Sequence, residues 1–192
     1  MKANTKKIAG TGLLTAIVVV LQLLGSFIKF GPFSISLVLI PIVVGAALYG
    51  KWSGAWLGLA FGIAVLASGD AGAFLAVNPA GTVVTVLLKG LLAGLVAGLV
   101  YSLIEKKNKM AATVAAAVVC PVVNTGVFLI GCLVFFMDTV RGWAEGAGFG
   151  SNVGTYMIVG LVGLNFVFEL AVNIILSPVI VKLVRLGRKE TK

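Results

Sequence analysis

The chain has 192 residues, of which 60% are hydrophobic and only 11% are charged. Water-soluble domains have about 25% charged residues, so this composition excludes a soluble globular protein and indicates one that lies in a lipid bilayer. The net charge is +9, and because the sequence has no histidine and no cluster of metal-ligating side chains, we expect no metal site and no cofactor.

Six apolar runs dominate the sequence. A helix that spans a bilayer needs about 20 largely apolar residues, and the runs that meet or approach this length are 8–28, 35–50, 52–69, 82–104, 111–136 and 156–181. The second and third runs are short and meet at Lys51. Since backbone polar groups in lipid must be satisfied within helices, we predict an all-α integral membrane bundle of about six transmembrane helices, which forms a single transmembrane domain over residues 1–192.

The first run follows three lysines, Lys2, Lys6 and Lys7, as a secretory signal would. It is longer than the apolar region of a signal peptide and has no clear cleavage site, so we expect a retained helix. Gly12 and Ala16 are four residues apart and share one face of it. Small residues let helix backbones approach closely, and this face is expected either to pack within the bundle or to dock another membrane subunit.

Glycines recur every fourth residue in two of the other runs. The two sets are Gly54, Gly58 and Gly62 in the third run, and Gly90, Gly94 and Gly98 in the fourth. Each set lines one helix face, and lipid provides no hydrophobic drive for helix association, so close packing of small residues matters more than in water. We predict that both faces pack against neighbouring helices of the bundle.

The segment from Gly45 to Lys51 matches the first part of a phosphate-binding P-loop, a motif that continues with Ser or Thr. The next residue is Trp52, and the segment ends an apolar helix instead of following a strand. The sequence also has no Ser-His-Asp or Cys-His arrangement. We therefore predict no ATPase site, no catalytic residue and no enzymatic activity.

Two ionisable residues lie inside apolar runs, Lys89 in the fourth and Glu169 in the sixth. Such a side chain costs at least about 2.5 kcal/mol in the membrane interior and needs a partner or a cavity. Three interpretations stay open: the two residues pair with each other, they line a ligand cavity open to the outside, or the Lys89 side chain extends outward along its own stem.

Asparagines accompany these charges. Asn165, Glu169 and Asn173 follow one another at intervals of four residues and share a helix face. We expect Asn165 and Glu169 to contact a ligand and Asn173 to bond a neighbouring helix. Asn124 lies one turn after Pro121, which bends a helix by removing a backbone hydrogen bond. Asn124 therefore lines a cavity or bonds another helix, and Gln22 is a weaker candidate of the same kind.

The connections at the outer side fit a cover over such a cavity. Phe30 and Phe33 flank a Gly-Pro turn between the first two runs, where two aromatic side chains could cover a solute. The longest connection, about 137–155, contains Arg141 and a glycine-rich stretch, Gly146 to Gly150, that we expect to be a flexible loop. The alternative for each connection is an ordinary interfacial loop.

Twelve of the 15 basic residues precede the first run, follow the sixth or lie around Lys51 and Lys106 to Lys109. Six spans place all four regions on one side, which the positive-inside rule identifies as the cytoplasm. We therefore expect a multi-pass protein of the cell membrane with cytoplasmic N- and C-termini. The basic tail is explained by anionic lipid headgroups; it has no aromatic residues between its charges, so we expect no nucleic-acid partner.

Taken together, the six helices, the basic N-terminus, the pair Gly12 and Ala16, and the segment from Asn165 to Pro178 before a basic tail resemble the substrate-binding subunit (S component) of energy-coupling factor vitamin transporters. The resemblance covers the full length; the family often has an alanine pair where this chain has Gly12 and Ala16. It implies a subunit that binds a vitamin near the outer face and works with a membrane coupling protein and two cytoplasmic ATPases. Gly12 and Ala16 would then contact the coupling protein.

Under this resemblance the solute-binding residues would be Lys89, Asn124, Asn165 and Glu169, with Phe30, Phe33 and Arg141 above them. A lysine or arginine that holds a carboxylate, with asparagines for amide and hydroxyl groups, favours pantothenate; riboflavin and folate are also possible. An unpaired Glu169 in the pocket would favour a solute with an amine or several donors. The alternative function is a stand-alone secondary transporter or small channel, although the two halves of the chain show no convincing repeat.

Overall fold

The computed structural model describes residues 2–26, 29–30, 33–34 and 37–190, and almost all of these are helical. The helices are α1 Lys2–Gly25, α2 Leu39–Tyr49, α3 Lys51–Ser68, α4 Gly72–Leu75, α5 Pro79–Ile104, α6 Lys109–Phe135, α7 Met137–Gly146, α8 Val153–Thr155, the π-helix η1 Tyr156–Leu161, α9 Gly163–Ile175 and α10 Ser177–Glu190. The strands β1 Lys29–Phe30 and β2 Phe33–Ser34 form a short antiparallel pair between α1 and α2. The predicted all-α membrane bundle is therefore confirmed.

Within the described residues, four helices are long and apolar enough to cross a bilayer: α1, α3, α5 and α6. A fifth span forms if α8 and η1 together (Val153–Leu161) count as one helix with α9 across a 44° bend. The remaining apolar helix, α2, has only 11 residues, which rise about 16 Å. It contacts α1, α3, α5, α6 and α10 and buries most of its length, so this helix packs in the centre of the bundle and does not need to match the lipid thickness.

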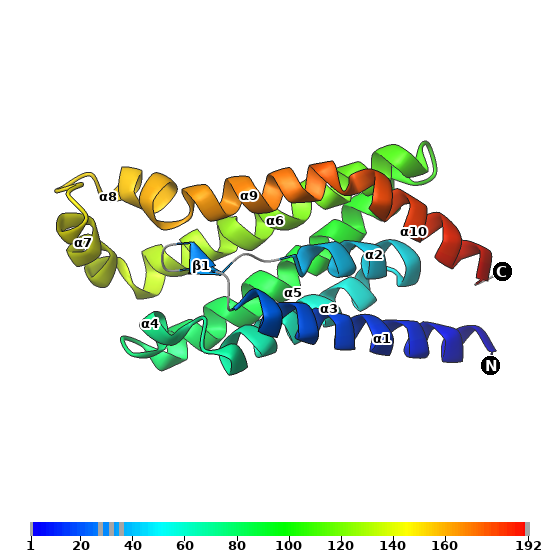
Figure 1. Ribbon diagram of the computed structural model, residues 1–192, viewed down its shortest axis with the longest axis horizontal. Helices are drawn as coiled ribbons and strands as arrows, with labels where there is room; N and C mark the ends of the chain where they lie inside the picture. Colours follow the sequence, from blue (N-terminus) through cyan, green and yellow to red (C-terminus); the bar gives the residue numbers. More distant parts are fainter. Residues whose placement is uncertain (1, 27–28, 31–32, 35–36, 191–192) are drawn as a thin grey trace.

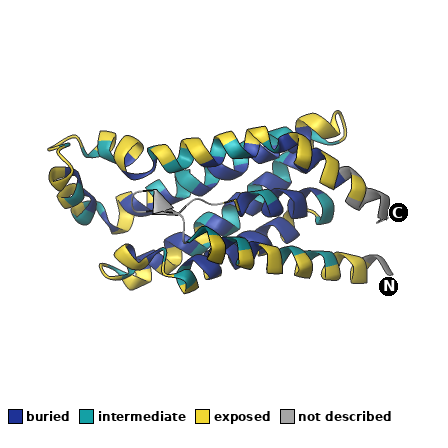
Figure 2. Ribbon diagram, viewed as in Figure 1, coloured by how far each residue is buried: buried dark blue, intermediate teal, exposed yellow. Residues whose placement is uncertain are grey.

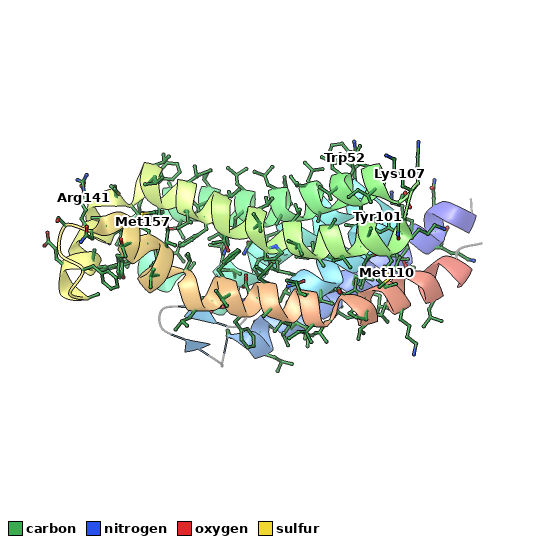
Figure 3. All side chains as sticks on the ribbon, turned by 90° about the horizontal axis from the view of Figure 1, so that it is seen from above. Trp52, Tyr101, Lys107, Met110, Arg141 and Met157 are labelled. Carbon is green, nitrogen blue, oxygen red and sulfur yellow. The ribbon has the colours of Figure 1, made fainter. Side chains whose placement is uncertain are left out.

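Both termini lie at one end of the bundle, and α4, α7 and α8 lie at the other (Figure 1). Trp52, near the start of α3, and Lys107, between α5 and α6, are at the end with the termini, whereas Arg141 and Met157 are at the opposite end (Figure 3). All four basic regions therefore gather at one end, as the alternation of charges predicted. Exposed residues lie along the outer faces of the long helices, where a bilayer would contact them (Figure 2).

The predicted glycine faces pack directly on each other. A Cβ atom at Gly58 would clash with the backbone oxygen of Gly90, and one at Gly94 would clash with the backbone oxygen of Gly54. This register makes α3 and α5 antiparallel, with their backbones in contact where side chains normally intervene. The expectation that both glycine sets pack within the bundle is confirmed, and the close approach fixes α5, the helix that carries Lys89.

We expect Gly58→Ala to lower the free energy of unfolding by about 2 kcal/mol, because the added methyl group must displace a backbone atom and not a flexible side chain. Gly126→Ala in α6 is the matched control, since a Cβ there meets nothing within 4 Å and alanine favours a helix by about 0.5–1 kcal/mol. In detergent, the midpoint of thermal unfolding should therefore be lower than that of the wild type for Gly58→Ala and higher for Gly126→Ala. Equal midpoints for the two variants would contradict the packing seen between α3 and α5.

The last third of the chain differs from the sequence prediction in two places. The expected loop 137–155 begins with the helix α7, because Val140 and Ala144 lie one turn apart and are buried. Only its glycine-rich end is a turn, where Gly148 and Gly150 have φ of 81° and 53°, a conformation that favours glycine.

The sixth apolar run is also divided, where one continuous helix was expected. It consists of η1, α9 and α10. The bend between η1 and α9 follows a π-helical turn, a common cause of kinks. The break before α10 precedes Pro178, which has no N–H to continue the ladder of hydrogen bonds.

Candidate functional site

A cavity lies among α1, α3, α5, α6 and α9, on the side of the bundle away from the termini. Its empty volume is about 620 Å³, which includes the open space at its mouth. Its walls include Gln22 near the end of α1, Asp70 after α3, and Thr82, Thr85 and Lys89 in the first part of α5. These positions place the cavity toward the end that carries α4 and α7.

Lys89 is half-buried, and its ammonium group is held between two aromatic rings. Its Nζ lies 5.6 Å from the ring centroid of Phe61 and 5.5 Å from that of Phe128, distances typical of cation–π contacts. Across the described ranges, Nζ has no carboxylate within ion-pair distance and no hydrogen bond. Of the interpretations left open by the sequence, the structure therefore places Lys89 in a cavity wall, not in an ion pair with Glu169.

Glu169 and Asn165 lie one turn apart on α9, and both line the cavity. The Nδ2 of Asn165 donates a hydrogen bond of 3.3 Å to Oε1 of Glu169. The other oxygens, Oε2 of Glu169 and Oδ1 of Asn165, are buried and accept no hydrogen bond from a described residue. Glu169 is only 2% exposed. Its carboxyl group therefore lies in the protein interior with only one of its two oxygens hydrogen-bonded to a described residue.

Asn173, one turn further along α9, is fully buried but does not line the cavity. Its Nδ2 donates a hydrogen bond of 2.8 Å to the backbone oxygen of Glu169. The sequence predicts a bond from Asn173 to a neighbouring helix, but the bond is made within α9 instead. Asn173 therefore supports the backbone beneath Glu169.

Asn124 on α6 and Thr85 on α5 complete the polar wall. Both residues are buried, and Oδ1 of Asn124 and Oγ1 of Thr85 accept no hydrogen bond from a described residue. The two helices approach closely here because Gly131 of α6 leaves room for the Thr85 side chain. Of the two interpretations for Asn124, the structure favours the cavity wall.

The end of α1 closes the cavity through a hydrogen bond. Nε2 of Gln22 donates to Oδ2 of Asp70 at 2.5 Å and lies 3.4 Å from the hydroxyl of Ser68. From the sequence, Gln22 is only a weaker candidate for the cavity, and Asp70 is not among the predicted site residues. A signal for Asp70 was present, since it is one of only six acidic residues in the chain.

Aromatic side chains cover the cavity at the α4 end, and two of them, Phe74 and Trp143, come from connections that the sequence predicts at the outer side. Phe74 of α4 makes edge-to-face contacts with Phe128, Phe136 and Trp143, with ring centroids 5.1–5.4 Å apart. The side chains of Phe30 and Phe33, the expected cover, lie outside the described part of the structure, which gives only the backbone pairing of these two residues.

Three other predicted residues lie away from the cavity. Arg141 is on α7, exposed, and forms an ion pair of 3.3 Å with Asp138. It does not line the cavity, because α7 turns its apolar residues inward and its charges outward. Gly12 and Ala16 are exposed on α1, and a Cβ at Gly12 would meet nothing within 4 Å.

A helical membrane bundle with a polar cavity enclosed between its helices defines a membrane-embedded, solute-binding protein. Residues 6–181 match the family described as ECF transporter, substrate-specific component, and the chain belongs to this family. It is thus a transmembrane, substrate-binding subunit of a transport system. Comparison with curated proteins gave no match.

Among solved structures, the chain is similar to that of ThiT from Listeria monocytogenes. The TM-score is 0.62 at 20% sequence identity, and the similarity covers 93% of this chain and 96% of ThiT. At this identity the comparison shows a shared fold. The overall helix arrangement of this chain is therefore shared with that structure.

Proposed function

We propose that this subunit binds a vitamin with high affinity for uptake, and that pantothenate is the first candidate. The observation that supports this is the Lys89 ammonium, which faces the cavity between two phenylalanine rings without a carboxylate at ion-pair distance in the described structure. Pantothenate has a carboxylate for Lys89 and amide and hydroxyl groups for the side chains of Asn124, Asn165 and Glu169. A charge-assisted hydrogen bond is about twice as strong as a neutral one.

Riboflavin and folate remain the other candidates for this cavity. The aromatic side chains around it suit a flat ring, which both of these vitamins have and pantothenate lacks. Folate also has carboxylates for Lys89, whereas riboflavin has none. We rank pantothenate first because the polar side chains of the wall outnumber the aromatic ones.

Uptake would be energised by a separate membrane coupling protein and two cytoplasmic ATPase subunits. The coupling protein would dock on α1 at Gly12 and Ala16. In α1 only 11% of the most apolar stretch is buried inside the bundle, compared with 56% in α3. A helix so little covered by its own chain has a face available for another membrane protein. The basic end of the bundle, with both termini, would face the cytoplasm.

A stand-alone secondary transporter is the second candidate function. The observation in its favour is the bend of 44° between η1 and α9, beside the cavity, since secondary transporters often place discontinuous helices at their binding sites. Such a protein would move its solute without the coupling protein.

Two measurements on the purified chain test these proposals. Native mass spectrometry in detergent should detect a co-purified solute, and its mass should identify pantothenate. In liposomes the chain alone should bind the solute and not accumulate it. A protein that is always empty would contradict the binding function, and ion-driven accumulation by the chain alone would favour the secondary transporter.

A further inference from the structure

One side of the cavity is formed mainly by hydrogen-bond acceptors. Oε2 of Glu169, Oδ1 of Asn165 and Oδ1 of Asn124 are all buried, and none of them accepts a hydrogen bond from a described residue. The three residues come from α9 and α6, which pack against each other. A buried acceptor without a donor is costly, and native proteins leave few of them, so three in one wall indicate donors that come from outside the chain.

The orientation of the Asn165 amide follows from its neighbour. Its Nδ2 donates to Oε1 of Glu169, which leaves Oδ1 as the atom that needs a donor. An ionised carboxylate accepts hydrogen bonds through both oxygens and donates none. The Oε2 of Glu169 and the Oδ1 of Asn165 therefore both need a hydrogen-bond donor, which an N–H or O–H group of the ligand can provide.

The cation is on another helix. Lys89 belongs to α5, and the phenylalanines on which its Nζ rests belong to α3 and α6. The same cavity therefore offers the Lys89 ammonium from α5 and a set of hydrogen-bond acceptors from α9 and α6. An anionic group placed against these acceptors would offer them no donor, which disfavours binding of the solute in the opposite orientation.

On the basis of the proposed function, we infer that the solute is bipolar: it bears an acidic group that Lys89 binds and, at the other end, two or more hydroxyl or amino donors that Glu169, Asn165 and Asn124 accept. Glu169 is then the residue that determines specificity for the donor-bearing end. Solutes with acidic groups at both ends are excluded. Pantothenate, with a carboxylate at one end and two hydroxyl groups at the other, belongs to this class.

The test uses calorimetry with two probes, pantothenate and panthenol, in which an alcohol replaces the carboxylate. Wild-type protein should bind pantothenate about 10- to 100-fold more tightly than panthenol. The isosteric variant Glu169→Gln should bind both probes more weakly than the wild type does, by a similar factor of about 10 or more. Lys89→Met should bind the two probes with equal affinity, because Lys89 contacts only the end of the solute that bears the acidic group.

If Glu169→Gln fails to fold, Asn165→Leu tests the same wall. The inference is overturned if either folded variant binds both probes as tightly as the wild type does. It is also overturned if such a variant binds only pantothenate more weakly. If neither probe binds to wild-type protein, the co-purified solute decides: a bipolar acid with donors supports the inference, and a solute without donors or without an acid overturns it. An empty wild-type protein that binds neither probe overturns the proposed function as well.

Discussion

Lys89→Met is expected to weaken pantothenate binding by about 100-fold and to make the empty protein more stable. The loss follows from the removal of a charge-assisted hydrogen bond, which is worth about 1.5–3 kcal/mol. The gain follows from the cost of a cation without an ion pair in the membrane interior. Methionine is similar in length and still fills the space between Phe61 and Phe128, so the bundle should keep its packing.

The matched control for this variant is Lys51→Met. Lys51 also lies over an aromatic ring, with its Nζ 5.7 Å from the centroid of Trp52, but it is at the end of the bundle with the termini and outside the cavity. Calorimetry should show unchanged binding for Lys51→Met, and thermal unfolding should show a higher midpoint only for Lys89→Met. Full affinity in the Lys89 variant would remove the main support for an acidic solute.

The architecture was predictable wherever it depends on the cost of polar groups in lipid. The lengths of the apolar runs predicted the long helices, and the glycines at every fourth position predicted that two faces pack closely on neighbouring helices. The structure shows that these two faces, on α3 and α5, pack on each other. Lys89 and Glu169 were identified for the same reason, because an ionisable residue inside an apolar run needs an explanation. The structure places both in one cavity.

Features that depend on tertiary packing were not predictable. The helix α7 forms because Val140 and Ala144 can be buried against the end of the bundle, and the local composition of glycine and charge indicated a loop instead. Thr82 and Thr85 share a face with Lys89 at intervals of three and four residues, but threonine is common in helices that bury no site. Phe74 became a cover only because α4 folds over the cavity.

Helix α1 connects the cavity with the proposed docking face. Gln22 contributes to the cavity wall and bonds Asp70, whereas Gly12 and Ala16, two to three turns earlier on the same helix, are exposed. The helix is held to α3 by polar contacts, among them the bond of 3.2 Å from Trp56 to the hydroxyl of Thr15. A protein that docks on α1 therefore contacts an element that also contributes to the site.

Gly12→Leu is accordingly expected to abolish solute uptake in cells and to leave solute binding unchanged. A Cβ atom at this position meets nothing within 4 Å in the isolated bundle and Gly12 is exposed, so the fold and the cavity should be kept. In the complex it would separate two backbones that small residues allow to touch. Uptake of radiolabelled pantothenate, co-purification with the coupling protein and calorimetry on the purified chain measure the three effects.

Two controls separate docking from a general effect of an added side chain. Ala171→Leu enlarges an exposed small residue on α9, on a face not proposed for docking, and should leave uptake unchanged. Gly10→Leu should instead destabilise the chain, because a Cβ at Gly10 clashes with the Tyr49 side chain. If Gly12→Leu weakened solute binding in the purified chain, this face would belong to the internal fold. If uptake persisted, the coupling protein would have to dock elsewhere, since α1 would no longer present a smooth surface.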